Sequence, residues 1–191
     1  GRDPTYSGPI AVNTAAVVRA IGYKAGFRPS APATGSFLFI DDVVRQPADP
    51  PGFPENWGTD SEVGLVPSDY AMDPRVVDGA LPPHTVEAGL LDLPVLSIVA
   101  EPTDLFGATR GIYIHPKSRG DAWERAASIE WIDPSGPVSF QVNAGVRMQG
   151  NSSRRPFRMQ KHSFRLDFRS EYGVGRLERP IIPGATGNGF Y

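Results

Sequence analysis

Residues 145–169 read GVRMQGNSSRRPFRMQKHSFRLDFR, and this stretch is predicted to form two amphipathic strands joined by a basic loop. Apolar residues alternate with polar ones on both sides of the loop. In the strand that enters the loop, the apolar positions are Phe140, Val142, Ala144, Val146 and Met148. In the strand that leaves it, over residues 161–169, they are Phe164, Leu166 and Phe168. This period of two predicts that one face packs on a core, while the face with Arg147, Lys161 and Arg165 points outward.

The loop between the two strands has the composition of an anion site. It offers free backbone amides and hydroxyl groups from Gly150, Asn151, Ser152 and Ser153, and three arginines follow them directly. Residues 145–179 contain nine Lys or Arg and three Asp or Glu, a net charge of +6, whereas the rest of the chain carries −8. Amides around Gly150 are therefore suited to hold a phosphate group whose charge Lys161 and Arg147 neutralise.

A plainer interpretation of the same residues stays open. A basic outer face is also typical of a solvated β-hairpin. Arg147 and Arg165 would then form cross-strand ion pairs with an acidic neighbour, either Asp167 or Glu171. Ser153 would only cap the loop.

Composition excludes several classes of function. The chain has no cysteine, and its three histidines, His84, His115 and His162, lie far apart, so a metal site is not expected. No apolar run approaches the roughly 20 residues that cross a bilayer. The motifs of serine hydrolases and P-loop nucleotide sites are missing. Nucleic-acid binding lacks a stacking platform, because Phe157 is the single aromatic residue in the loop.

Twenty-one glycines and twenty prolines among 191 residues favour a mainly β fold of the α+β class. We expect strands at 14–23 and 34–40 that end a small sandwich in residues 1–40. Residues 41–92 are predicted to be a proline-rich linker or wrapping arm, in which Phe53 and Trp57 pack on a neighbouring domain. Short helices are expected within 68–78, capped by Ser68 or Asp69, and within 85–91.

Residues 93–170 are predicted to form a mostly antiparallel sheet of about five strands. Its expected strands are 93–100, which is buried, then 111–115, 127–132, 138–148 and 161–169. A short helical start is expected at 102–104. Residues 123–132 also have helical propensity, but the turn sequence DPSGP at 133–137 leads straight into the next strand and favours a hairpin.

Two stretches resemble known families. Residues 7–39, SGPIAVNTAAVVRAIGYKAGFRPSAPATGSFLF, resemble the C-terminal half of the Ig-like domain of the chitobiase/β-hexosaminidase C-terminal type. That resemblance implies an accessory module without catalysis, one that is able to contact a cell-surface polysaccharide. Residues 93–181 resemble the start of the spore-coat protein H (CotH) kinase family. The most specific piece is G-V-R-x-x-G-N-S-S-R followed by K-x-S-F-R-L-x-F, here at 145–154 and 161–168.

The CotH resemblance implies the β-rich N-lobe of an atypical protein-kinase-like domain in residues 93–191. Members of that family phosphorylate proteins on serine with ATP and a divalent metal such as Mg²⁺. Carried over to this chain, Lys161 is the candidate for the strand lysine that contacts the ATP phosphates. The remaining residues of the nucleotide pocket are then Arg147, Gly150, Asn151, Ser152, Ser153 and Arg165.

The catalytic and metal-binding carboxylates of the family come from a later part of the domain, so no catalytic or metal residue is expected in this chain. The chain begins without Met and stops after a glycine-rich run, and it is interpreted as a fragment that binds nucleotide weakly and transfers no phosphate. The resemblances imply a bacterial extracellular or cell-surface protein with a surface or coat protein as substrate. The alternative is a structural, adhesion or carbohydrate-associated β module that kept the fold without catalysis.

Overall fold

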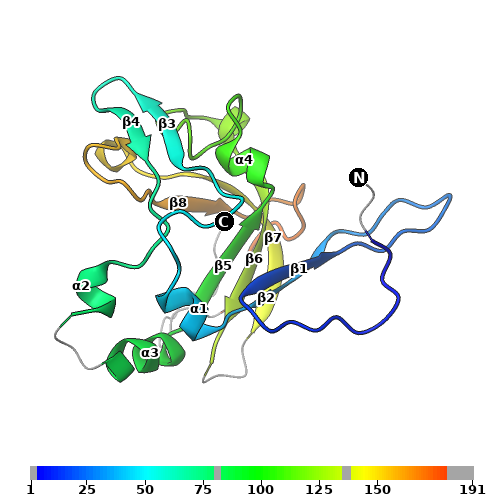
Figure 1. Ribbon diagram of the computed structural model, residues 1–191. Helices are drawn as coiled ribbons and strands as arrows, with labels where there is room; N and C mark the ends of the chain where they lie inside the picture. Colours follow the sequence, from blue (N-terminus) through cyan, green and yellow to red (C-terminus); the bar gives the residue numbers. More distant parts are fainter. Residues whose placement is uncertain (1–3, 80–82, 135–138, 180–191) are drawn as a thin grey trace.

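A four-stranded antiparallel sheet forms the centre of the molecule (Figure 1). The computed structural model describes residues 4–79, 83–134 and 139–179. The strands run in the order β5-β6-β7-β8, so each one pairs with its neighbour in the chain. Their bounds are β5 Val95–Ala100, β6 Arg125–Ile132, β7 Phe140–Met148 and β8 Phe164–Asp167. The expectation of a mainly β fold is confirmed.

The predicted alternation decides which face of this sheet is buried. Ala127 pairs with Ala144, and Val146 pairs with Leu166, which places apolar side chains of three strands on one face. The buried core is made of Ile112, Ala127, Ile129, Ala144, Val146, Met148, Phe168 and Leu177. The opposite face carries polar residues, among them Ser128, Arg147 and Arg165. This division of the two faces follows directly from the period of two in the sequence.

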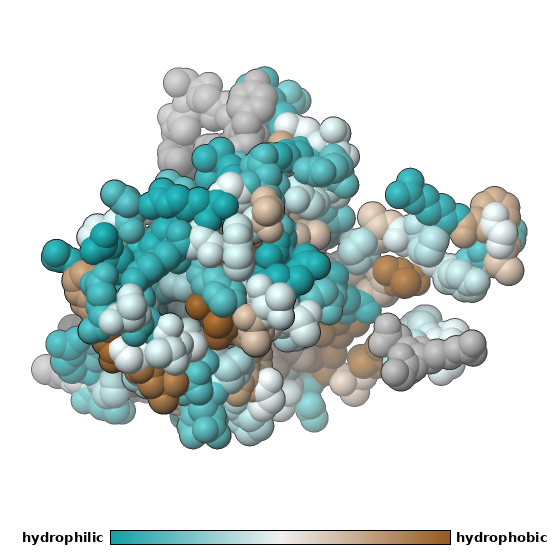
Figure 2. Space-filling model, turned by 90° about the horizontal axis from the view of Figure 1, so that it is seen from above, coloured by the Kyte–Doolittle hydropathy of each residue, from teal (hydrophilic) through white to brown (hydrophobic). Residues whose placement is uncertain are grey.

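The first two strands form a separate hairpin of β1 (Ala16–Ala20) and β2 (Ala33–Phe37). It lies against the polar face of the main sheet. The backbone N–H of Ser36 donates to Glu130 Oε2 over 2.7 Å, and the Ser36 hydroxyl lies 2.7 Å from that of Ser97. The hairpin and the loops around it extend to the right in Figure 1 and project from the body in Figure 2.

The segment expected as a linker contains regular structure. It begins with the short helix α1 (Ile40–Val44) and includes a hairpin of β3 (Asn56–Asp60) and β4 (Gly64–Pro67). Gly58 and Gly64 both adopt positive φ there, at +84° and +75°, a conformation that glycine reaches without strain. The prolines around this hairpin concealed it in the sequence, because strands of four or five residues give little alternation.

Trp57 packs on Tyr113, outside the segment 41–92, whereas Phe53 is 52% exposed and its ring centroid lies 6.2 Å from that of Phe106. Trp57 is 5% exposed, and its ring centroid lies 4.8 Å from that of Tyr113. Its indole N–H donates to the Tyr70 hydroxyl over 3.2 Å. Phe53 lies 5.4 Å from the Tyr70 ring. These aromatic contacts fasten the β3–β4 hairpin to the core.

Three short helices accompany the sheet: α2 (Pro74–Val77), α3 (Pro83–Asp92) and α4 (Pro102–Phe106). They confirm the helical expectations, but the cap of α2 was assigned wrongly. The side chain of Asp73 accepts from the Arg75 N–H at its start, whereas Asp69 accepts from Ala71 N–H in a turn further upstream. Two single turns of 3₁₀ helix, η1 (Asp121–Trp123) and η2 (Ser152–Arg154), flank the sheet.

The expected strand at residues 111–115 is absent, so the described sheet has four strands rather than about five. They form turns on α4, where Ile112 N–H donates to Asp104 O and Tyr113 N–H donates to Leu105 O. These bonds satisfy the backbone, and Ile112 is buried in the core. The β5 strand is half-buried rather than buried, because it lies at the edge of the sheet. Most of the turn expected at 133–137 lies outside the described residues.

Helices α3 and α4 and the remaining helices of the described residues are all short. None of them has the length and apolar character needed to cross a lipid bilayer.

Candidate functional site

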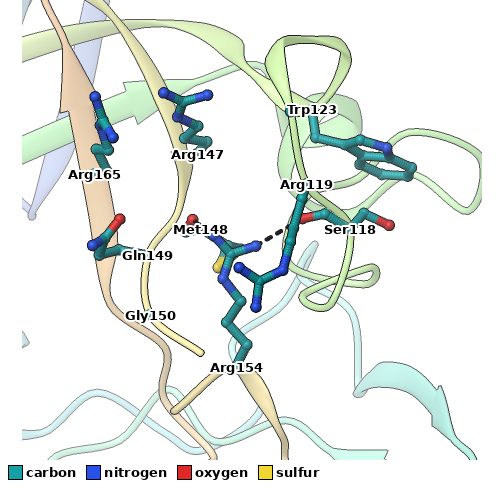
Figure 3. Close-up of a pocket in the computed structure, with 10 residues that line it drawn as sticks. Ser118, Arg119, Trp123, Arg147, Met148, Gln149, Gly150, Arg154 and Arg165 are labelled. Atoms are coloured by element: carbon teal, nitrogen blue, oxygen red, sulfur yellow. Dashed lines mark hydrogen bonds between the residues drawn. The ribbon is translucent and has the colours of Figure 1, made fainter. Parts of the chain in front are cut away.

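A polar pocket opens where the end of β7 meets the loop that precedes η1. Its volume is about 310 Å³. Four arginines contribute to the wall, and Figure 3 shows Arg147 and Arg165 on neighbouring strands with Arg119 and Arg154 below them. The lining residues are Ser118, Arg119, Gly120, Trp123, Arg147, Met148, Gln149, Gly150, Arg154 and Arg165. We call this cavity the arginine pocket.

Gly150 allows the chain to turn at the edge of the pocket. Its φ is +103°, and a Cβ at this position would clash with Ser153 Oγ. Only glycine meets both conditions without strain. The next residue, Asn151, accepts a hydrogen bond of 2.8 Å from Arg119 Nη2 through its side-chain oxygen. The loop predicted to hold an anion therefore contributes one wall of the pocket and orients Arg119.

Arg154 fixes the floor of the pocket. The residue is only 8% exposed, and its Nη1 donates to the Ser118 carbonyl over 2.8 Å while Nη2 donates to the Met148 carbonyl. Its Nε is buried without a hydrogen-bond partner in the described structure. Burial, with the nearby charges of Arg119 and Arg147, lowers the pKa of Arg154. The charged side chains that line the pocket are all positive, which disfavours a further cation there.

Arg147 and Arg165 lie directly opposite each other in the β7–β8 ladder, and Asp167 bridges them. Arg147 Nε lies 2.9 Å from Asp167 Oδ2, and Arg165 Nε donates to Oδ1 over 2.8 Å. The Asp167 side chain is 5% exposed. The plainer interpretation of a cross-strand ion pair thus matches the structure for Arg147 and Asp167, whereas Arg165 pairs with Asp167 within β8. Asp167 offsets part of their charge and aligns both guanidinium groups.

A second layer of charges lies behind Arg147. The Glu124 side chain is 2% exposed, with Oε2 3.2 Å from Arg169 Nη2 and 3.9 Å from Arg147 Nη1. Asp121 accepts from Arg147 over 3.1 Å and from Arg169 over 3.3 Å. Hydrogen bonding and the charge of Arg169, together with Arg147, lower the pKa of Asp121.

Close packing holds the Glu124 carboxylate in place. A Cβ on Gly145 would overlap it, so glycine at this position of β7 makes room for the carboxylate. Burial and the Glu124 carboxylate raise the pKa of Tyr172 to about 12. Glu171 also lies 4.0 Å from Arg169, so five arginines face four carboxylates over both layers, and the cluster keeps a positive surplus.

The structure brings some of the predicted site residues together and leaves others apart. Arg147, Gly150 and Arg165 line the arginine pocket, and Asn151 joins it through Arg119. Ser152 and Ser153 lie in η2 and are not lining residues; the Ser153 carbonyl lies 3.1 Å from His162 Nδ1. Ser153 therefore helps to set the conformation of the loop and does not line the pocket.

Lys161 lies apart from the other residues of the predicted site. It precedes β8, which begins at Phe164 rather than at residue 161 as expected. Its ammonium donates to the Ala71 carbonyl over 2.8 Å and lies 4.0 Å from Asp69 Oδ2. Lys161 is not among the residues that line the pocket. In this structure it joins the loop to the segment before α2.

Sequence reasoning missed Arg119, Trp123 and Arg154 as parts of the site. Arg154 was noted only as one basic residue of the loop. Arg119 and Trp123 belong to an irregular segment whose position depends on tertiary contacts, and no spacing in the sequence connects them with Gly150. Among the described residues, no group of His, Asp and Glu side chains is arranged to hold a metal ion.

Comparisons with protein-family models, curated proteins and solved structures gave no match for this chain.

Proposed function

We propose that this chain is the N-lobe part of an atypical kinase similar to the CotH family, and that the arginine pocket holds the phosphates of its nucleotide. The observation that carries the proposal is the convergence of four guanidinium groups on one cavity beside Gly150. Arginine presents a planar set of N–H donors that matches phosphate oxygens and keeps its charge at every physiological pH.

The size of the pocket supports a phosphate chain as the bound part. About 310 Å³ is at the lower end of the range in which small-molecule sites fall. Ser118, Gly120, Gln149 and the four arginines give this volume a strongly polar wall, with Trp123 and Met148 as its apolar members. A nucleoside would therefore extend beyond the pocket, and the affinity of this chain for ATP is expected to be low, with Kd of about 1 mM.

The resemblance implies ATP and Mg²⁺, and the residues of the pocket fit the ATP phosphates but not the metal ion. Four guanidinium groups suit the ATP phosphates, whereas the Mg²⁺ of the family prefers oxygen ligands, which the resemblance assigns to a later part of the domain. In this chain Arg119 would bind phosphate, and Arg147 and Arg165 would orient it. Arg154 would hold the two walls of the pocket together. Transfer to a serine of a surface or coat protein would need the rest of the domain.

Titration calorimetry with ATP tests the proposal. Arg119 is exposed and its one described bond goes to Asn151, so Arg119→Gln should fold normally. Loss of one charged hydrogen bond is expected to weaken ATP binding about tenfold. Arg28→Gln, on the exposed loop of the N-terminal hairpin, is the matched control and should bind as the native chain does. Equal affinity of native chain and Arg119→Gln would contradict the proposal.

Lys161→Ala separates the pocket from the lysine suggested by the resemblance. Because Lys161 bonds to Ala71 away from the pocket, its loss should leave ATP affinity within about twofold of the native value. If Lys161→Ala weakened ATP binding as much as Arg119→Gln does, Lys161 would be the residue that contacts phosphate, and the assignment to the arginine pocket would be overturned.

The second candidate is a structural or adhesion module without nucleotide binding. The ion pairs of Arg147 and Arg165 with Asp167 favour it, because paired guanidinium groups also stabilise a sheet without any ligand. The same calorimetry distinguishes the two: no heat of binding at 10 mM ATP, about ten times the expected Kd, would leave the structural role as the better account.

A further inference from the structure

We infer that the arginine pocket takes a polyphosphate chain in its metal-free form, so that Mg²⁺ competes with the protein for this ligand. The inference rests on the proposed function and adds the ionic state of the ligand. It concerns the phosphate subsite of this chain, and it differs from the usual arrangement in which a divalent metal lies between nucleotide phosphates and protein carboxylates.

The wall of the pocket carries this inference. Its charged members are Arg119, Arg147, Arg154 and Arg165, and no Asp or Glu is found among the lining residues that the structure describes. Mg²⁺ on phosphate usually keeps one or two carboxylate ligands of the protein. A magnesium complex placed here would meet guanidinium groups on every charged side.

The three carboxylates next to the pocket lie close to arginines, and none of them is among the described lining residues. Asp167 lies within 2.9 Å of both Arg147 and Arg165, and its side chain is almost fully buried. Glu124 is buried against Gly145 with Arg169 at 3.2 Å. The exposed Asp121 contacts Arg147 and Arg169. If Asp167 turned toward a metal in the pocket, Arg165 would lose the carboxylate partner that the structure describes for it, which is costly because the Asp167 side chain is buried.

Electrostatics sets the direction of the effect. Every charged side chain that lines the cavity is a guanidinium group, so the cavity attracts anions and repels cations. A divalent ion removes two negative charges from a triphosphate. The metal-free ligand therefore has the stronger attraction to the pocket.

The experiment uses the whole chain and two probes, inorganic tripolyphosphate and ATP. Binding is followed by the fluorescence of Trp123, which lines the pocket, and the Trp123→Phe variant identifies its signal among the other tryptophans. Each probe is titrated with EDTA and then with enough Mg²⁺ to saturate the phosphates, at equal ionic strength. We expect Mg²⁺ to weaken binding of both probes about tenfold.

The outcomes separate this inference from the proposed function. If both probes bind and Mg²⁺ weakens their binding, the inference and the proposed function are both supported. Similar affinities for the two probes would then identify the phosphate chain as the recognised part. Tighter binding of ATP would indicate an additional contact to the nucleoside. Binding that is unchanged or tightened by Mg²⁺ overturns the metal-free inference and leaves the proposed function standing. If neither probe binds in either condition, both are overturned.

Variants show whether the pocket causes the effect. Arg119→Gln should weaken binding of metal-free tripolyphosphate more than binding of its magnesium complex. The ratio of the Kd with Mg²⁺ to the Kd with EDTA should therefore be smaller in this variant than in the native chain. Arg28→Gln should keep the full ratio. A full ratio in Arg119→Gln would assign the magnesium effect to general charge and contradict the inference.

Discussion

Arg147 shows how one residue serves the sheet and the pocket together. Its Nε lies 2.9 Å from Asp167, its Nη1 lies 3.1 Å from Asp121, and its side chain is 17% exposed. A guanidinium group has five N–H donors, so these contacts leave it able to donate to a ligand. Ion pairing and anion binding, which are alternatives in the sequence, are compatible at this residue.

Gly150→Ala tests the turn at the mouth of the pocket. The new Cβ would stand at φ +103° and clash with Ser153 Oγ, so we expect the free energy of unfolding to fall by about 1–3 kcal/mol in urea denaturation. Gly8→Ala is the matched control, because no atom lies within 4 Å of the built Cβ, and its effect should stay below about 0.5 kcal/mol. Equal stability of the two variants would mean that the turn is not strained.

Tyr172 gives the chain an alkaline limit to its stability. Its pKa is raised from 10.0 to about 12 by burial and the Glu124 carboxylate, so the unfolded chain loses this proton before the folded chain does. The contribution of Tyr172 is therefore fully present below pH 10 and is lost as the pH rises from 10 to about 12.

Urea denaturation across this pH range measures the effect. Stability of the native chain should fall more steeply above pH 10 than that of Tyr172→Phe, which has no phenol to ionise. Parallel pH profiles of the two proteins would show that the phenol of Tyr172 is not held in its neutral form.

At the scale of elements, the β3–β4 hairpin is joined to the core by aromatic rings. Trp57 is buried between Tyr70 and Tyr113, and Tyr113 in turn lies 6.0 Å from Phe164 of β8. The Tyr113 hydroxyl also accepts from the His162 N–H. This chain of contacts runs from the proline-rich segment to the end of the strand that carries Arg165.

Trp57→Ala tests that connection. Removal of a buried indole leaves a cavity, and we expect a loss of about 3 kcal/mol in the free energy of unfolding. Leu65→Ala in the same hairpin is the control, since Leu65 is 63% exposed and its loss should cost less than about 0.5 kcal/mol. If Trp57→Ala cost as little as the control, the hairpin would not depend on this contact.

The lengths of the elements and their local hydrogen bonds explain which of them could be predicted from the sequence. Strands β6 and β7 are eight and nine residues long; the turn sequence between them predicted their pairing, and the alternation in β7 predicted its buried face. Residues 111–115 have strand composition, but hydrogen bonds to α4 outweigh that propensity. The alternation predicted a strand from residue 161, whereas β8 begins at Phe164 and the Lys161 ammonium donates to the Ala71 carbonyl.

At the scale of the whole molecule, the arginine pocket and the exposed apolar side chains of the N-terminal region lie on different parts of the surface. The arginine pocket lies on the body, beside the end of β7. The N-terminal region exposes apolar side chains, among them Tyr6, Ile10, Ile21, Tyr23 and Phe27. Brown residues on the projecting arm in Figure 2 show this part of the surface. Anion binding is therefore expected on the body of the protein and not on the N-terminal hairpin.

The most direct test is to map tripolyphosphate on the whole chain by two-dimensional ¹H–¹⁵N NMR in EDTA. The account predicts shifts concentrated at residues 118–123 and 147–154 and at the Nε–Hε resonances of Arg147, Arg154 and Arg165. Shifts confined to the exposed basic residues of the loop, such as Arg155 and Arg158, or shifts spread evenly over the surface, would contradict it.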